Sequence, residues 1–500
     1  MIPPAGSVRD WLDRRAAETP DAISHIFADE GVSLTWAELR DIAADIAAHL
    51  AGQGVQKGES VALCLPNGRA GVTCLFGALY GGFRATPLNL AAGAAAMGYA
   101  IEHSRAGFAL VGPAQATIFA DALAETDALP VTIEAGDTIS WPNKTTAELE
   151  EVEASDHALL MYTSGTTGRP KGVVHDQSSL LAGGWTVALA HELTPQDRAL
   201  MVLPFFHING LCVTLMGPLV SGGAAIVVEK FSLSRFWGWA RDHRATWFSV
   251  VPTIISHLLH GPETPDEKVI DQLRFARSAS APLPIETQRA FEDRFGLPIV
   301  ETMGLTETAA QMLSNPLPPG VRKIGSPGIA IGNETEIIAD GQIAPRGASG
   351  EIAVRGPNVM KEYLFNPEET AKTITQDGWL LTGDLGWMDD NGYVYVTGRR
   401  KELIIKGGEN IAPREIDEAL YCSDEVIEAA AFARPCPTYG QRVEAAVRLS
   451  DAAKSTEADL IALCASKVGA FKAPDRVHLM AELPKGPSGK IQRLKLAEIL

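Results

Sequence analysis

Short apolar runs alternate with helix-length amphipathic stretches through the first 300 residues, and this alternation limits the possible folds more than any other feature. The runs are bounded by glycine, proline or polar residues, as is typical of strands buried on both faces. They are residues 61–65, 158–162, 199–203, 224–228 and 247–251. Between them, apolar residues spaced by three and four predict helices, as at Val72, Leu75, Phe76 and Leu79 and at Leu233, Phe236, Trp237 and Ala240. We therefore expect an α/β fold in which helices cover parallel sheets.

The length of the chain and a change in its composition predict two domains. Five hundred residues exceed what one hydrophobic core usually serves. After about Pro316, glycine, proline and β-branched residues become more frequent, which predicts a β-rich subdomain over about 317–397. A basic turn at 398–401 then introduces a further α+β pattern. We expect a large N-terminal domain at 1–397, built of layered α/β subdomains and the β-rich subdomain, and a small mobile α+β domain at 398–500.

Composition argues against several classes of protein. With 46% apolar and 21% charged residues, the chain resembles globular proteins that fill a core. The formal charge of −18 would repel a polyphosphate backbone, so we expect no nucleic-acid partner. No run of about eighteen apolar residues occurs and the N-terminus lacks a secretion signal, so we expect a cytoplasmic protein without membrane insertion. The 6 cysteines are scattered, which favours neither a zinc site nor a disulfide framework.

The strongest local signal is a loop of glycine, threonine and serine that follows the run at 158–162. The residues expected to contact phosphate are Thr163, Ser164, Gly165, Thr166, Thr167, Gly168 and Lys171. Glycines let backbone N–H groups converge, hydroxyls add donors and the lysine adds a positive charge, a set that suits a nucleotide's phosphates. The spacing differs from a Walker A loop, because Gly172 and not Ser or Thr follows Lys171. Taken alone, a flexible surface loop explains these residues equally well.

The string from Tyr162 to Gly172 resembles the signature of the acyl-adenylate-forming superfamily, which includes acyl-CoA synthetases, luciferases and the adenylation domains of peptide synthetases. The segments 303–307, 382–384 and 484–491 resemble further motifs of that superfamily in the same order, and the similarity covers nearly the whole chain. The resemblance implies that ATP binds at the loop and that a carboxylic acid is activated as its adenylate.

The motif at 303–307 is implied to bind the α-phosphate and a metal. In the family, its threonine contacts the α-phosphate and its glutamate holds Mg²⁺, roles that pass to Thr306 and Glu307, with Thr167 as a further metal ligand. A hard cation between phosphate oxygens and a carboxylate is what phosphoryl chemistry uses. Met303 stands at the adenine-stacking position, where an aromatic residue is usual; its thioether is polarizable but cannot stack as a ring does.

Other family motifs imply the ribose site, the catalytic lysine and a hinge. Asp384 is implied to accept both ribose hydroxyls and Arg399 to contact the ribose. Lys490 is implied to meet the carboxylate and the α-phosphate during adenylation. Lys401 is the implied hinge about which the small domain rotates, and Gly408 would let the backbone pass close to the pantetheine arm of coenzyme A.

The acyl pocket is expected to be lined by His207, Asn209, Arg277, Ser280 and Ala310. His207 resembles a gating residue of several family branches, and a satisfied core histidine explains it about equally well. The segments 274–278 and 311–316 resemble oxalate–CoA ligases, which implies a short acid with a second negative group. In those enzymes a histidine that can bind the distal carboxylate stands where this chain has Ala310, so malonate or sulfoacetate is an alternative to oxalate. Arg277 is expected either to balance the second charge or to be structural.

Together these features predict an acid–CoA ligase that uses ATP, Mg²⁺ and coenzyme A. Such an enzyme adenylates a small carboxylic acid, then forms the thioester and releases AMP and pyrophosphate. Adenylation for a carrier protein would use the same ATP residues, and a luciferase-like oxygenase uses the same adenylate. A nucleotide-binding protein without catalysis is the non-enzyme alternative, and the presence of Lys490, Glu307 and Lys171 together argues against it. The sequence leaves open whether the protein is a homodimer.

Overall fold

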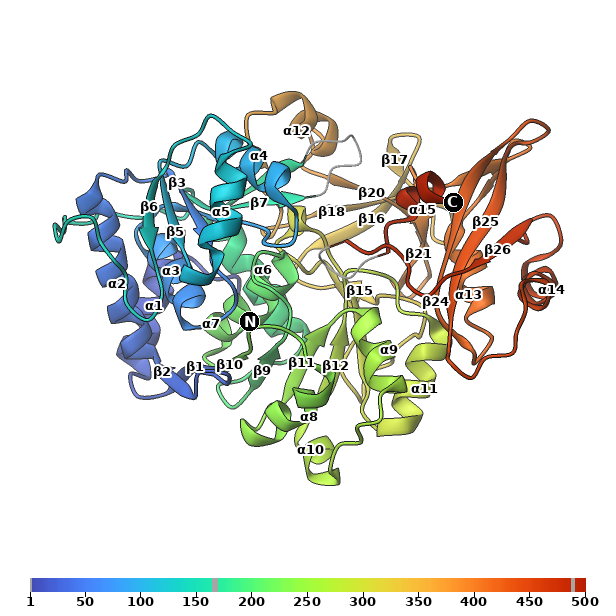
Figure 1. Ribbon diagram of the computed structural model, residues 1–500, viewed down its shortest axis with the longest axis horizontal. Helices are drawn as coiled ribbons and strands as arrows, with labels where there is room; N and C mark the ends of the chain where they lie inside the picture. Colours follow the sequence, from blue (N-terminus) through green and yellow to red (C-terminus); the bar gives the residue numbers. More distant parts are fainter. Residues whose placement is uncertain (1, 164–169, 487–490) are drawn as a thin grey trace.

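The computed structural model describes residues 2–163, 170–486 and 491–500. A large α/β domain occupies most of the molecule, and a small C-terminal domain lies at one end of the long axis (Figure 1). In these described ranges, no helix combines the length and the apolar character that crossing a bilayer requires. The α/β fold class predicted from the alternating runs is confirmed.

The largest sheet follows the order β15-β14-β13-β12-β11-β9-β10-β1-β2. Its central pairs from β13 to β1 are parallel, while β2, β14 and β15 add antiparallel edges. Its strands are β1 (Ile23–Phe27), β2 (Val32–Thr35), β9 (Arg198–Met201), β10 (Ala224–Val227), β11 (Trp247–Val250), β12 (Phe275–Ser278), β13 (Ile299–Met303), β14 (Leu313–Ser314) and β15 (Ile329–Ala330). The apolar runs at 199–203, 224–228 and 247–251 are therefore strands, as predicted.

A second sheet follows the order β19-β8-β7-β4-β3-β5-β6. It is parallel from β7 to β6, and β8 and β19 extend it with antiparallel pairs. Its strands are β3 (Ser60–Cys64), β4 (Arg84–Pro87), β5 (Phe108–Val111), β6 (Val131–Glu134), β7 (His157–Thr163), β8 (Lys171–Asp176) and β19 (Glu362–Tyr363). The pair Thr163 and Lys171 joins β7 to β8 at the two ends of the predicted phosphate loop.

Helices fill the space between the two sheets and cover their outer faces. The inner helices are α1 (Val8–Glu18), α2 (Trp36–Gln53), α3 (Arg69–Tyr80), α6 (Gln177–Ala190) and α7 (Gly217–Ser221), whose buried side chains share one core with both sheets. The outer helices are α4 (Ala94–Ser104) and α5 (Ala116–Leu123) on the second sheet, and α8 (Leu233–Asp242), α9 (Pro252–His260), α10 (Glu267–Gln272) and α11 (Ile285–Phe295) on the first. Helices α2 and α3 pack so closely that a Cβ at Gly77 would lie 2.4 Å from Ile46.

The β-rich part is an antiparallel sheet in the order β17-β16-β18-β20-β21. Its elements are β16 (Glu334–Ala339), β17 (Gln342–Ile343), β18 (Gly350–Arg355), α12 (Pro367–Thr373), β20 (Leu380–Met388) and β21 (Val394–Arg399). Within the predicted span of about 317–397, β15 pairs with the first sheet and β19 with the second. The predicted domain boundary at 397 falls inside β21, and the boundary itself stays a prediction.

The small domain is an α+β unit with its own hydrophobic core. Its sheet follows the order β23-β22-β25-β24, with β26 beside β25. Its elements are β22 (Ile404–Lys406), β23 (Glu409–Ile411), α13 (Pro413–Leu420), β24 (Val426–Cys436), β25 (Gly440–Leu449), α14 (Glu457–Val468), β26 (Arg476–Leu479) and α15 (Arg493–Ile499). Helix α13 carries side chains that contact the large domain: Arg414 Nη1 donates to the Val396 carbonyl oxygen over 2.9 Å.

Candidate active site

A cleft between the large and the small domain brings predicted nucleotide residues together. Its walls come from the end of β13, the loop 280–282, strands β20 and β21, and the small domain at α13 and Arg493. Among the predicted residues, Ser280, Met303, Asp384 and Arg399 line this cleft. Segments that are about a hundred residues apart in the chain therefore form one site.

Asp384 and Arg399 form an ion pair across two antiparallel strands. The register of β20 and β21 sets the two residues opposite each other, and Arg399 Nε donates to Asp384 Oδ1 over 2.8 Å. The charge of Asp384 raises the pKa of Arg399. The backbone N–H of Asp384 donates to Thr382 Oγ1 over 3.1 Å, so a hydrogen bond within the predicted motif stabilises its backbone. Arg399 thus orients a carboxylate that has acceptor capacity left for a vicinal diol.

The turn after β13 places Thr306 and Glu307 in a short 3-10 helix, η3 (Thr306–Thr308). This turn requires a glycine, since a Cβ at Gly304 would lie 1.1 Å from the carbonyl oxygen of Ala310. The Leu305 N–H donates to the hydroxyl of Thr308 over 2.9 Å, which closes the start of η3. The glycine of the motif is therefore required by a close contact between two stretches of backbone.

One tyrosine links Glu307 to Lys171. The Tyr363 hydroxyl donates to Glu307 Oε1 over 2.8 Å, and Lys171 Nζ lies 4.7 Å from the centroid of the Tyr363 ring. Burial raises the pKa of Tyr363 far above its ordinary value, so the phenol remains a donor. Lys171 also forms an ion pair with Glu369 on α12, and this contact lowers the pKa of Glu369. Lys171, the predicted phosphate residue, and Glu307, the predicted metal residue, thus both contact the Tyr363 side chain.

Glu307 fits a magnesium ion that arrives with a nucleotide. Among the residues described, no group of three or more His, Cys, Asp and Glu side chains could hold a metal by itself. Mg²⁺ in nucleotide enzymes usually keeps several waters, binds substrate phosphates and takes one or two carboxylates from the protein. Glu307 is partly exposed, and its Oε1 accepts from Tyr363. A single oriented carboxylate is what that type of site needs.

Arg277 is buried at the centre of a network of neutral side chains. Its Nη1 donates to Asn209 Oδ1 and to Ser249 Oγ, each over 2.9 Å, and its Nε and Nη2 both donate to Gln311 Oε1 over 3.2 Å. Asn209 Nδ2 in turn donates to Ser280 Oγ over 3.1 Å. Burial lowers the pKa of Arg277 to about 9, so its guanidinium is still charged at neutral pH. In the described part of the chain, no carboxylate pairs with this charge.

The other two residues of the predicted acyl pocket flank this network in the chain. His207 precedes a π-helix, η2 (Asn209–Met216), and its ring lies edge-on to Phe206 with centroids 4.9 Å apart. Ala310 is buried beside Gln311, with a left-handed φ of 80°. Hydrogen bonds join Asn209, Arg277 and Ser280, whereas the contribution of His207 and Ala310 to an acyl pocket stays a prediction.

Several predicted residues lie outside the described residues or away from the cleft. The former are Ser164, Gly165, Thr166, Thr167, Gly168 and Lys490. Thr163 ends β7, directly before the first of these gaps. Lys401 lies on an exposed turn after β21, and Gly408 lies on an exposed turn between β22 and β23 with a φ of 88°. Their predicted roles as hinge and pantetheine contact stay predictions.

Comparison with known proteins decides the family. Residues 12–364 match the family model of the AMP-binding enzymes, and residues 415–490 match that of the AMP-binding enzyme C-terminal domain. The chain belongs to the AMP-binding enzyme family. Its predicted membership of the adenylate-forming superfamily is therefore confirmed.

Relatives of this AMP-binding enzyme match it over nearly its full length. A sulfoacetate–CoA ligase from Cupriavidus necator is 45% identical over 489 residues, 96% of each chain. An oxalate–CoA ligase from Arabidopsis thaliana is 35% identical over 480 residues, 93% of each chain. The crystal structure of ATP-bound MatB from Rhodopseudomonas palustris superposes with a TM-score of 0.90 at 30% identity, over 98% of each chain.

Sequence patterns alone did not indicate several side chains of this AMP-binding enzyme that contact predicted site residues, among them Ser249 in the Arg277 network and three near the phosphate residues. These three are Tyr363 and Glu369, described above, and His175, whose Nε2 donates to the carbonyl oxygen of Thr306 over 2.7 Å. Burial lowers the pKa of His175, which keeps the ring neutral, and the Ser179 hydroxyl donates to its Nδ1 over 3.1 Å. A polar residue inside the apolar strand after the phosphate loop was the one signal that could have identified His175.

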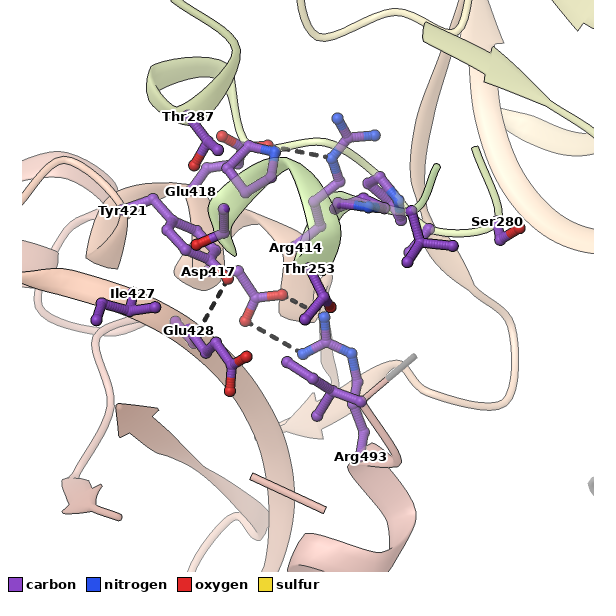
Figure 2. Close-up of a pocket in the computed structure, with 18 residues that line it drawn as sticks. Thr253, Ser280, Thr287, Arg414, Asp417, Glu418, Tyr421, Ile427, Glu428 and Arg493 are labelled. Carbon is purple, nitrogen blue, oxygen red and sulfur yellow. Dashed lines mark hydrogen bonds and ion pairs between the residues drawn. The ribbon is translucent and has the colours of Figure 1, made fainter. Parts of the chain in front are cut away.

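A second cavity of the AMP-binding enzyme lies between the two domains and adjoins the cleft (Figure 2). Figure 2 shows Arg493 pointing toward Asp417 on α13; its Nη1 donates to Asp417 Oδ1 over 3.1 Å. Next to this pair, Glu418 accepts a hydrogen bond from the N–H of Ile285 at the first turn of α11, over 3.2 Å. A carboxylate of the small domain therefore caps a helix of the large domain.

Proposed function

We propose that this protein joins a short carboxylic acid with a second anionic group to coenzyme A, while ATP is cleaved to AMP and pyrophosphate. The acid–CoA ligase activity follows from its family and from relatives named as CoA ligases. The observation that supports it best is the single cleft in which Met303, Asp384 and Arg399 meet. These are the residues that the family motifs assign to adenine and ribose.

The chemistry requires two balanced steps. First, a carboxylate oxygen of the acid bonds to the α-phosphorus of ATP as the bond from that phosphorus to pyrophosphate breaks. Second, the thiol of coenzyme A loses its proton and bonds to the acyl carbon, and AMP leaves. In this proposal Lys171 and Lys490 neutralise the phosphates and the approaching carboxylate, while Thr306 binds the α-phosphate. Glu307 and Thr167 hold Mg²⁺, which offsets the negative charge of the phosphates when bound.

Arg277 supports a substrate with a second negative charge. A buried guanidinium without a carboxylate partner is destabilised by its lost hydration, and a bound anion nearby would compensate that loss. Through Asn209, its hydrogen bonds reach Ser280, which lines the cleft. The names of the relatives agree with this charge pattern, because sulfoacetate and oxalate are both dianions. We therefore place oxalate, malonate and sulfoacetate ahead of simple monocarboxylic acids.

Acid-dependent exchange of pyrophosphate into ATP tests the function and the substrate class together. Acetate, oxalate, malonate and sulfoacetate would be compared, each with and without coenzyme A. We expect at least one dianion to drive exchange about tenfold or more faster than acetate, as one charge-assisted hydrogen bond would provide. Thioester should form only when coenzyme A is added. Equal rates with acetate would refute the substrate class, and no exchange with any acid would refute adenylation by these acids.

Four finer features belong to the same proposal. The small domain would rotate about Lys401 between the two steps, so that Lys490 and the thiol need not occupy the acyl carbonyl together. Gly408 would then contact the pantetheine arm. A cytoplasmic location and a homodimer complete the proposal, and size-exclusion chromatography with light scattering would test the assembly.

A further inference from the structure

The backbone of Tyr363 is fixed by the segments that frame the phosphate loop. In the antiparallel pair of β19 and β8, Tyr363 lies opposite Val173, and the Leu364 N–H donates to the Gly172 carbonyl oxygen over 2.8 Å. The Tyr363 N–H donates to Thr370 Oγ1 over 3.0 Å, which ties it to α12. Tyr363 is thus held between the strand that leaves the loop and the helix that carries Glu369.

The side chain of Tyr363 contacts two predicted ligands at once. It is 4% exposed, with its hydroxyl on Glu307 Oε1 and its ring beneath Lys171 Nζ. The same segment also holds the backbone of Glu307, because the Met360 N–H donates to the Glu307 carbonyl oxygen over 2.8 Å. Glu307 is therefore restrained at both its main chain and its carboxylate by residues that follow β18.

We propose that Tyr363 is a positioning residue, whose hydroxyl sets the orientation of the Glu307 carboxylate toward Mg²⁺ and whose ring keeps Lys171 beside the same phosphates. The inference rests on the proposed function, which makes Glu307 and Lys171 ligands of MgATP. With Oε1 held by the phenol, Oε2 would remain free to bind Mg²⁺ without a search over carboxylate rotamers. Loss of such an outer partner typically lowers metal affinity by about 10-fold to 100-fold.

A purely structural role makes a different prediction. Tyr363 also packs in a hydrophobic cluster that joins the β-rich sheet to β8, together with residues such as Val173, Leu380 and Val394. If packing were its only role, removing the hydroxyl would change thermal stability and leave the magnesium dependence of ATP binding unaltered. The two roles are therefore separable by a binding measurement.

The test compares Tyr363→Phe with Tyr393→Phe. Tyr393, a buried tyrosine directly before β21, is a matched control. Its ring centroid lies 4.3 Å from Lys323 Nζ and its hydroxyl donates to the Val321 carbonyl oxygen, away from Glu307. ATP binding would be measured by isothermal titration calorimetry over a series of free Mg²⁺ concentrations and in EDTA, with acid and coenzyme A omitted. We expect Tyr363→Phe to need about tenfold more free Mg²⁺ to reach half of the increase in ATP affinity that Mg²⁺ produces. Its ATP affinity in EDTA should equal that of the wild type.

Tyr393→Phe should keep the magnesium dependence of the wild type, and both variants should melt at similar temperatures because each loses one buried hydroxyl contact. An unchanged magnesium dependence in Tyr363→Phe would overturn the inference, and so would an equal change in Tyr393→Phe. A wild-type protein that binds no MgATP would instead overturn the proposed function, so the two failures are distinguishable.

Discussion

Predicted site residues have partners that hold them in position. Arg399 holds one oxygen of Asp384, Tyr363 holds one oxygen of Glu307, and His175 holds the backbone of Thr306. Each partner leaves part of the ligand's hydrogen-bonding capacity unused, which is what a binding residue needs. A substitution that keeps the shape of the ligand residue but removes its charge should therefore affect binding more than folding.

Asp384→Asn should raise the KM for ATP by about tenfold or more, because a hydrogen bond to a charged group contributes about 1.5–3 kcal/mol. The matched control is Glu334→Gln, since Glu334 also pairs across antiparallel strands, with Arg355 Nη2 over 2.6 Å. That pair is exposed and does not line the cleft. Initial rates of pyrophosphate exchange at varied ATP would give both KM values. An increase in Glu334→Gln equal to that in Asp384→Asn would contradict a ribose role for Asp384.

The residues that could be predicted are those that stand in contiguous motifs. Thr382, Gly383 and Asp384 are neighbours in the chain, so a local pattern identifies them. Tyr363 lies 56 residues from Glu307, and Glu369 lies 198 residues from Lys171. No local propensity encodes such a contact, because tertiary packing alone brings those segments together. The motif residues could thus be identified from the sequence, whereas the side chains that contact them could not.

At the scale of secondary structure, long periodic elements were predictable and short irregular ones were not. The strands β3, β7, β9, β10 and β11 and the helices α3 and α8 lie where apolar periodicity placed them. Strand β19 has only two residues, too few to show a period, yet it carries Tyr363 into the second sheet. The π-helix η2 has an almost wholly apolar sequence, and its hydrogen-bond type leaves no periodic signal.

Helix α13 should make docking of the small domain sensitive to pH. Burial raises the pKa of Glu418 above its ordinary value of 4.5. The folded protein therefore binds this proton more tightly than the unfolded chain, so its unfolding free energy increases as pH falls through the raised pKa, down to about 4.5. Glu418→Gln lacks this titration. Any advantage in melting temperature that the variant has at about pH 8 should shrink toward about pH 5.

Differential scanning calorimetry across that pH range would measure the effect, with Glu415→Gln as the control. Glu415 lies on the same helix, partly exposed and paired with Lys472 over 2.6 Å, and it does not contact the large domain through that pair. A difference between wild type and Glu418→Gln that stays constant with pH would contradict the role of burial at this interface. The same difference in Glu415→Gln would assign the effect to the charge of α13 alone.

At the scale of the whole molecule, the small domain closes the cleft that the large domain begins. Arg414 and Arg493 line both the cleft and the neighbouring cavity, so one domain orientation shapes the two spaces together (Figure 2). Polar contacts help to maintain this orientation, such as Arg414 on the Val396 carbonyl oxygen and Glu418 on the Ile285 N–H. Polar contacts of this kind can exchange for others at small net cost in free energy, which suits the proposed rotation of the small domain.

The proposed division of labour between the two domain orientations predicts a selective defect in Lys490→Ala. In the proposed function, Lys490 neutralises two anions, a carboxylate and the α-phosphate, as they approach each other. No two anions have to meet when the thiol attacks a finished adenylate. The variant should therefore lose pyrophosphate exchange by about 100-fold or more, while its rate of thioester formation from supplied acyl-AMP and coenzyme A stays close to that of wild type. Lys495→Ala is the control, since Lys495 is exposed on α15 five residues further along the chain. Equal losses in both half-reactions would show that Lys490 supports the fold or both orientations of the small domain.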